Sequence, residues 1–156
     1  MTECLIAFGG NLSNPKVTFK LALGALCSGG FKLTGKSGLW RSPAWPAGSD
    51  QADYLNAVVK GRYNGEAFDL MDLLHAIEEE HGRVRSVPNA ARTLDLDLLV
   101  FGSLKCRTES LTLPHPRMLE RAFVLVPASE LDTKWLRYAR NLPEEDIRQT
   151  RYAGAW

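Results

Sequence analysis

Apolar residues along this chain follow two spacings, which together predict a sheet covered by helices. Alternating or continuous apolar runs at residues 5–8, 31–40, 54–63 and 94–101 are typical of β-strands. Apolar residues at helical spacing extend over residues 15–28 and 66–81. The order β-α-β-β-α-β predicts a ferredoxin-like α/β (α+β) sandwich in a single domain, with additional C-terminal elements after residue 102.

Local signals refine several of these boundaries. Asn14 can cap the first helix, and Pro15 suits its first position because proline lacks the N–H that this position leaves unused. Prolines and glycine within residues 41–52 predict a loop. Residues 123–126 fit either a buried strand or a turn of a core helix, and residues 144–151 fit a short C-terminal helix.

Composition indicates an ordinary globular protein with reduced cysteines. The chain has 156 residues, 24% of them charged, and its net charge of +1 gives no global attraction for nucleic acid or anionic membrane. No apolar run approaches the roughly 18 residues of a membrane span, and the N-terminus lacks the pattern of a secretory signal. The cysteines, at 4, 27 and 106, are odd in number and far apart, which favours free thiols and a cytoplasmic location.

The strand at residues 94–101 contains two aspartates, Asp95 and Asp97, among its apolar residues. Residues i and i+2 of a strand project from one face, roughly 6–7 Å apart. Aspartate is disfavoured in strands, and two neighbouring carboxylates repel each other unless a cation or proton lies between them. The pair therefore indicates a Mg²⁺ site; an edge strand with a solvated acidic face is the alternative.

Arginines next to this strand favour phosphate chemistry. Arg83, Arg85 and Arg92 precede the aspartates, and guanidinium groups bind phosphate in a bidentate manner. Carboxylates for metal and guanidinium groups for phosphate are the components of a phosphoryl-transfer site. Neutralisation of surface carboxylates is the alternative role for these arginines.

One formal nucleotide-binding pattern is rejected on context. Residues 30–37 match the P-loop pattern G-x-x-x-x-G-K-[ST]. A P-loop follows a strand and opens a helix, whereas here a helix precedes the match and Pro43 follows soon after it. We therefore predict a strand at this position.

Two further groups of residues are candidates for ligand binding. His115 lies between two prolines, close to Arg117 and Arg121, and could donate a hydrogen bond to a phosphate. Tyr54 and Phe123, with an amide at Asn56, could hold a flat heterocycle by stacking and hydrogen bonds, although core aromatics are the more common reading of such residues.

Taken in order, these segments resemble the 6-hydroxymethyl-7,8-dihydropterin pyrophosphokinase family of the folate pathway. Residues 92–97, Arg-Thr-Leu-Asp-Leu-Asp, are similar to the family's metal-site signature without a break. The other similar segments are residues 6–12, 50–57, 77–78 with 82–85, and 113–117 with 121–123. The resemblance runs from residue 5 to about residue 131, and it implies transfer of pyrophosphate from ATP to the hydroxymethyl oxygen of the pterin, which releases AMP.

The resemblance also implies roles for particular residues. Two Mg²⁺ ions would be held by Asp95 and Asp97, and charge in the transition state would be stabilised by Arg83 and Arg92. The pterin would lie between Tyr54 and Phe123, with its edge read by Asn56 and with Asp95, Ser42, Pro43 and Ala44 lining its pocket. ATP would be contacted by Glu78, Arg85, Arg92, Thr112, His115, Arg117 and Arg121.

The chain departs from the family at two positions, and two other functions stay open. Gly10 replaces a usual serine, and residues 86–91 lack the tryptophan often found before the site arginine. The alternatives are a Mg²⁺-dependent phosphohydrolase that uses the same aspartates, and a non-enzymatic ferredoxin-like domain that binds nucleic acid. The expected substrates are small molecules, and no nucleic-acid or membrane partner is expected. Residues 1–156 are expected to act as a monomer that is not fused to another enzyme.

Overall fold

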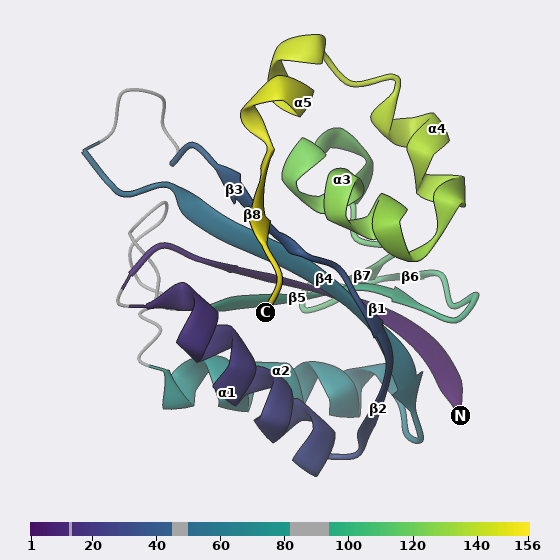
Figure 1. The fold of residues 1–156 in the computed structure, drawn as a ribbon. Coiled ribbons are helices and arrows are strands. Elements are labelled where there is room, and N and C mark those ends of the chain that lie inside the picture. The colour runs from purple at the N-terminus through teal and green to yellow at the C-terminus, as the bar shows by residue number, and fades with distance from the viewer. Residues whose placement is uncertain (13, 45–49, 82–93) are drawn as a thin grey trace.

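The computed structural model describes residues 1–12, 14–44, 50–81 and 94–156, and it has the predicted sandwich architecture (Figure 1). Its main sheet has the order β5-β1-β4-β3-β8, with β2 also paired to β4, and these neighbouring strands are antiparallel throughout. The strands are β1 (Thr2–Gly10), β2 (Phe31–Lys36), β3 (Leu39–Ser42), β4 (Tyr54–Tyr63), β5 (Asp95–Phe101) and β8 (Arg151–Gly154). The ferredoxin-like prediction is confirmed.

The predicted strand at residues 31–40 is two strands, β2 and β3, which pair with different parts of β4. The break falls at Ser37, a polar residue that is 2% exposed. Its backbone N–H donates to the carbonyl of Val58 at 2.9 Å, and its Oγ accepts from the Val58 N–H at 2.9 Å and donates to the Gly38 carbonyl. The serine thus satisfies backbone groups where the ladder is interrupted, which apolar alternation alone does not reveal.

Two helices, α1 (Pro15–Ser28) and α2 (Ala67–Glu80), cover one face of the sheet (Figure 1). The side chain of Asn14 accepts a hydrogen bond from the Val17 N–H, as the sequence predicts. The helices bury their apolar stripes against β1, β4 and β5 in one continuous core, to which α1 contributes Phe19 and Leu26 and α2 contributes Leu74.

The opposite face is covered by the C-terminal elements (Figure 1). They comprise the short helices η1 (Met118–Glu120) and η2 (Thr133–Trp135), and α3 (Ala122–Leu131), α4 (Leu136–Ala139) and α5 (Glu144–Gln149). A small hairpin of β6 (Cys106–Arg107) and β7 (Thr112–Leu113) lies beside the sheet next to β5 instead, and its Leu113 packs into the larger core. Residues 123–126 therefore belong to a helix, so the helical alternative is confirmed and the strand alternative is wrong.

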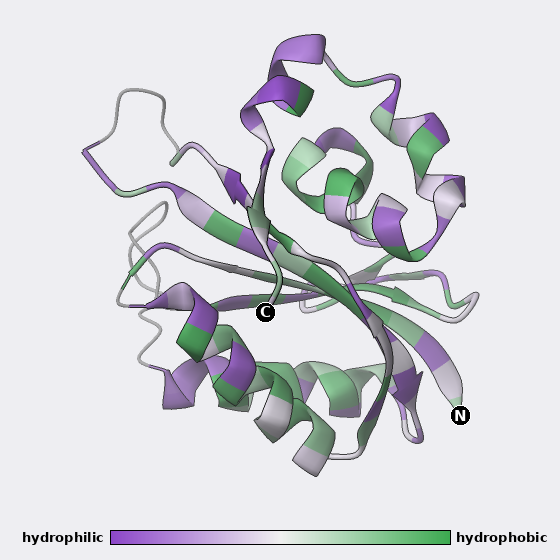
Figure 2. Cartoon of the chain, viewed as in Figure 1, coloured by the Kyte–Doolittle hydropathy of each residue, from purple (hydrophilic) through white to green (hydrophobic). Residues whose placement is uncertain are grey.

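A second, smaller core lies under α3, where Leu5, Val58 and Leu99 meet Val124 and Leu125. Hydrophobic residues recur along the strands and the helices that pack on them (Figure 2), and the buried ones pack between these layers. Within the described residues, no helix is both long and apolar enough to cross a membrane. The strand β8, which follows α5, is an element that the sequence does not predict, since residues 144–151 there suggest only a helix.

Candidate active site

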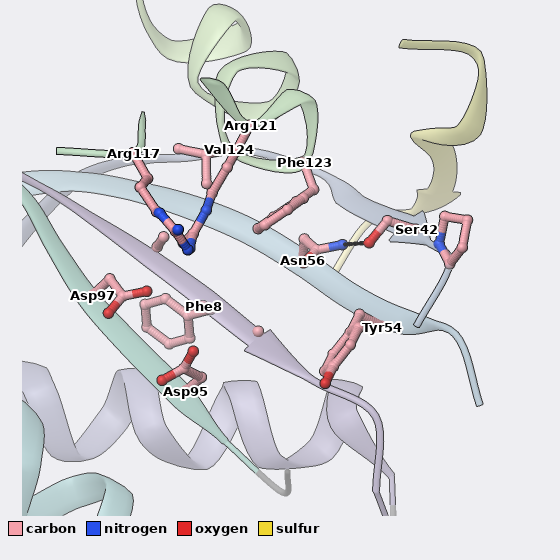
Figure 3. A pocket seen from close by; sticks show the side chains of 13 residues that line it. Phe8, Ser42, Tyr54, Asn56, Asp95, Asp97, Arg117, Arg121, Phe123 and Val124 are labelled. Carbon is pink, nitrogen blue, oxygen red and sulfur yellow. Dashed lines mark hydrogen bonds between the residues drawn. The ribbon is translucent and has the colours of Figure 1, made fainter. Parts of the chain in front are cut away.

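A cavity of about 450 Å³ lies on the sheet face that α3 covers, beside the N-terminal end of that helix (Figure 3). Strands β1, β3, β4 and β5 form its floor and one wall, and the other is formed by Arg117 and Arg121, which flank η1, and by the first turn of α3. It is lined by Ala7, Phe8, Gly9, Ser42, Pro43, Tyr54, Asn56, Asp95, Asp97, Arg117, Arg121, Phe123 and Val124. Nine of these residues are site candidates from the sequence, so the fold brings distant segments together as predicted.

At one end, which we call the charged end, Asp95 and Asp97 of β5 lie near Arg117 and Arg121 (Figure 3). The two aspartates project from the same face of β5, as their spacing predicts. In the neighbouring strand β1, Gly9 is paired with Asp95 and Ala7 with Asp97. Because these partners have little or no side chain, space remains above the carboxylates.

The cations of the charged end come from the segment that leads into α3. Arg117 precedes η1, and Arg121 is the N-cap residue of α3. The guanidinium groups point into the cavity, on the side of Asp97 (Figure 3). Arg121 also lies 5.5 Å from the centre of the Phe123 ring, in a cation–π contact. Both arginines are therefore placed to bind an anion within reach of the aspartates.

The other end, which we call the aromatic end, is formed by Ser42, Pro43, Tyr54, Asn56 and Phe123. Asn56 is 5% exposed, and its Nδ2 donates to the Ser42 Oγ at 2.9 Å and to the Trp40 carbonyl at 3.2 Å. Both amide hydrogens are thereby used, and this fixes the orientation of the side chain. Aromatic rings around a fixed amide suit a flat ligand that carries hydrogen-bonding groups at its edge.

A second cavity of about 210 Å³ shares Asp97 with the first. It is lined by Met71, Leu74, His75, Leu96, Asp97, Leu98, Glu109, Ser110, Leu111, Thr112, His115 and Pro116. Thr112 and His115 are thus near the aspartates but in a different cavity from the aromatic end. His75 also lines this cavity, but it is six residues from His81 along the chain, a spacing that does not suit a pair of zinc ligands on one helix face.

His115 is held by its backbone and its ring. Its N–H donates to the Leu99 carbonyl at 2.9 Å, and its Nδ1 accepts from the Arg117 N–H at 3.2 Å. Burial lowers the pKa of His115 below 6.5, and the positive charges of Arg121 and Arg117 lower this pKa further, against an opposing effect of Asp95. With Nδ1 as an acceptor, the neutral ring carries its proton on Nε2, where it is available as a donor.

Several predicted residues lie elsewhere. Glu78 of α2 is 2% exposed, and its Oε2 accepts from the Leu96 N–H at 2.8 Å, so its carboxylate holds β5 against the helix. Ala44 is buried beside Pro43 and does not line the cavity. The predictions for Arg83, Arg85, Arg92 and the loop at residues 86–91 lie outside the described residues.

The aspartate pair offers oxygen ligands for a cation. Among the described residues, no three or more His, Cys, Asp or Glu side chains gather as a metal-binding group. Mg²⁺ fits this donor set nonetheless, because proteins commonly hold it with one or two carboxylates and leave the remaining positions to water and substrate phosphates. A zinc centre with three or four protein ligands does not fit these residues.

Sequence reasoning missed Ala7, Phe8, Gly9 and Val124, which also line the cavity. For Ala7 and Gly9 the sequence contained a signal, because both are small residues of β1 and face the same side as the aspartates of the neighbouring strand. Together, the charged end and the aromatic end of this ferredoxin-like sandwich suit the binding of an anionic group next to a flat heterocycle.

Comparison with known proteins identifies the family. Residues 5–133 match the model of the 7,8-dihydro-6-hydroxymethylpterin-pyrophosphokinase (HPPK) family, which is most of the chain, so the chain belongs to this family. A curated relative, 2-amino-4-hydroxy-6-hydroxymethyldihydropteridine pyrophosphokinase of Pseudomonas aeruginosa, is 41% identical over 143 residues, which are 89% of this chain and 86% of the relative.

Other relatives are longer than this chain. The mitochondrial folate synthesis bifunctional protein of Arabidopsis thaliana is 35% identical over 129 residues, but the chain spans only 23% of its length. The crystal structure of wild-type Plasmodium falciparum HPPK-DHPS with SDX-DHP has a TM-score of 0.60 and 11% identity. The match covers 84% of this chain and 40% of the other, and it supports the fold alone.

Proposed function

We propose that this chain transfers the pyrophosphoryl group of ATP to 6-hydroxymethyl-7,8-dihydropterin, giving AMP and the pterin diphosphate, in folate biosynthesis. The observation that carries the proposal is the single cavity whose charged end suits phosphates and whose aromatic end suits a pterin. The phosphates of ATP and the pterin must lie next to each other at the point where the pyrophosphoryl group moves from ATP to the acceptor. Membership of the HPPK family supports the same reaction.

The pterin occupies the aromatic end. Its ring lies between Tyr54 and Phe123, and the Asn56 Oδ1 accepts from the amino edge of the heterocycle because Nδ2 is already engaged. Ser42 and Pro43 line this end of the cavity, while a contact of the buried Ala44 with the pterin stays a prediction. This arrangement directs the hydroxymethyl group toward the charged end, where Asp95 lies.

ATP extends from the charged end into the second cavity. Its phosphates are bound by Arg117 and Arg121, and the neutral His115 donates from Nε2. The second cavity, which is lined by apolar residues together with the polar Thr112 and His75, receives the nucleoside. A contact of Glu78 with ATP stays a prediction, as do the roles of Arg83, Arg85 and Arg92.

Asp95 and Asp97 would hold Mg²⁺, and Asp97 lines both cavities. We infer two ions, as the resemblance to the family implies. Bound Mg²⁺ would neutralise the charge of the phosphates and thus ease attack by the hydroxyl group. The residues of the chain hold the two substrates in line, while the guanidinium groups stabilise negative charge that develops on the transferred group.

We also infer a cytoplasmic monomer that folds as one domain over residues 1–156. Described cysteines Cys4, Cys27 and Cys106 are free, which fits a reducing compartment. One copy of the chain supplies both ends of the cavity, so the site needs no second copy. Light scattering of the purified chain would test the monomer, and one cooperative unfolding transition would support a single domain.

Product analysis tests the proposed reaction directly. The chain is incubated with ATP and Mg²⁺, with and without hydroxymethyl-dihydropterin, and nucleotides are separated by chromatography. AMP that forms only with the pterin, without ADP or free phosphate, is the expected result. ADP as the main product contradicts the proposal, and phosphate release without pterin supports a phosphohydrolase. Salt-dependent binding of single-stranded RNA without turnover would favour the nucleic-acid alternative.

A further inference from the structure

A cluster beside the cavity connects three elements through one side chain, that of Trp40 on β3. Its indole Nε1 donates to the Glu130 carboxylate of α3, and the Gly38 N–H donates to the same carboxylate at 3.3 Å. On β8, the ring of Tyr152 contacts the indole edge-on, with centroids 5.4 Å apart and an interplanar angle of 75°. None of these residues lines the cavities described above.

The backbone of Trp40 reaches the aromatic end. Trp40 is the register partner of Asn56 on β4, and its carbonyl accepts one of the two hydrogens on the Asn56 Nδ2. The second hydrogen goes to the Ser42 Oγ, two residues further along β3. Asn56 therefore depends on the path of β3 at residues 40–42 for the direction of its Oδ1, the polar atom of the side chain that does not donate to β3.

The indole of Trp40 acts on the other wall of the cavity. Phe123 is near the start of α3, and Glu130 is near its end, so the Trp40–Glu130 hydrogen bond ties this helix to the strand of Ser42. A shift of α3 along the sheet would change the gap between Phe123 and the residues of β3 and β4. A hydrogen bond to a charged acceptor is directional, whereas the apolar contacts beneath α3 are not.

We propose that Trp40, held between Glu130 and Tyr152, is a positioning residue that fixes the Asn56 amide and the width of the aromatic end. This inference rests on the proposed function, because the ligand of the aromatic end is taken to be the pterin. The consequence is selective: loss of the Trp40–Glu130 hydrogen bond weakens pterin binding, while the charged end and the second cavity keep their geometry.

The test uses Glu130→Ala, which removes the acceptor, Glu130→Gln, which keeps an acceptor oxygen, and Trp40→Phe, which removes the donor but keeps a ring against Tyr152. Glu130→Ala and Trp40→Phe should each raise the KM for pterin about three- to tenfold, the range for loss of one hydrogen bond. The KM for ATP and kcat should stay within about twofold of the unmodified values. Glu130→Gln should recover most of the loss.

A double variant and a surface control sharpen the result. Because donor and acceptor belong to one hydrogen bond, Trp40→Phe combined with Glu130→Ala should be no worse than the stronger single variant. Glu79→Ala removes an exposed carboxylate from α2, on the other face of the sheet, and should change neither KM. Melting temperatures of all variants show whether each is folded, and Glu130 is exposed enough that its variants should remain so.

Three results would overturn the inference: an unchanged KM for pterin in Glu130→Ala, equal rises in both KM values, or Glu130→Gln as impaired as Glu130→Ala. Calorimetric Kd values for pterin, measured with a non-hydrolysable ATP analogue, separate this inference from the proposed function. An unmodified protein that makes no AMP but binds pterin contradicts the function, and the Kd values of the variants then decide the positioning role. Absence of pterin binding contradicts both.

Discussion

On the sheet face that α1 and α2 cover, β1 contributes Cys4, Ile6 and Phe8, all of them buried in the larger core. On the opposite face the same strand contributes Leu5 and Ala7 to the smaller core and then Gly9 to the cavity. We call the side that packs on α1 and α2 the covered face, and the side that holds the cavity the open face, although α3 packs over part of the latter. Along β1, the covered face is therefore apolar to its end, whereas the open face changes from core to binding site. Strand alternation lets one strand serve both purposes.

The same change occurs along β5. Leu96 and Leu98 face the larger core, while Asp95, Asp97 and Leu99 face the other side. A shift of register by one residue would bury both aspartates and expose the leucines, so the covered face fixes where the carboxylates point. The uniform core on the covered face therefore positions the irregular, charged surface of the open face.

The largest effect is expected for Asp97→Ala on the open face. If the carboxylate holds Mg²⁺ against the transferred phosphates, its loss should lower kcat by orders of magnitude, about 10³-fold or more. Pterin binding should change much less, since the aromatic end keeps its residues. Steady-state kinetics and calorimetry measure the two quantities. Near-normal turnover would contradict a metal-binding role for Asp97. A large drop in melting temperature alongside the loss of kcat would show that the substitution acts through stability.

The converse effect is expected for Phe19→Ala on the covered face. Phe19 of α1 is 0% exposed and contacts Phe8 and Trp156 edge-on, with centroids 5.6 and 5.8 Å away. Its truncation should lower the free energy of unfolding by about 3–5 kcal/mol, because a large cavity is left behind. Chemical denaturation measures this loss. The kinetic constants of the fraction that stays folded should be close to normal, and a selective loss of pterin affinity would contradict the separation of the two faces.

The elements that the sequence predicts well are those of the covered face. The apolar stripes of α1 and α2 and the nearly continuous apolar run of β4 are strong local signals, and the Asn14 cap lies where the sequence places it. By contrast, β8 has four residues and pairs with β3 from the far end of the chain. Its formation depends on tertiary contacts, such as the Arg151–Asp53 ion pair at 2.9 Å, which no local pattern encodes.

The charged residues of the site could be predicted because they conflict with their surroundings in the sequence. Two aspartates in a strand are a local contradiction that a functional site explains. Trp40 and Glu130 give no such contradiction, since a tryptophan in a strand and an exposed glutamate in a helix are ordinary. Their relation appears only when β3 and α3 are placed side by side.

A smaller effect is expected for Phe123→Ala, which matches Phe19→Ala in chemistry but lies on the open face. Phe123 is 36% exposed, so its loss should leave the melting temperature almost unchanged. The pterin loses one stacking partner, which should lower its affinity about tenfold, since such aromatic pairs contribute about 0.5–1.5 kcal/mol beyond the area they bury. Calorimetry with pterin measures the change. A large loss of stability with unchanged affinity would show that this ring belongs to the core instead.

The smallest effect is expected for the pH dependence of stability through His115, at the edge of the open face. Burial and the nearby arginines hold the pKa of His115 below 6.5 in the folded protein, so the unfolded chain binds a proton more readily. Stability should therefore be fully present above about pH 6.5 and should fall as the pH decreases from there through the folded pKa. Urea unfolding of the native protein and of His115→Asn between about pH 5 and about pH 8 isolates this contribution, because the variant lacks the titrating ring.

Binding of a phosphate group next to Nε2 favours the charged ring, so an ATP analogue should raise the pKa of His115 measured by NMR. A pKa at or above 6.5 in the free protein would contradict the burial argument, and an analogue that leaves the pKa unchanged would place the phosphates away from His115.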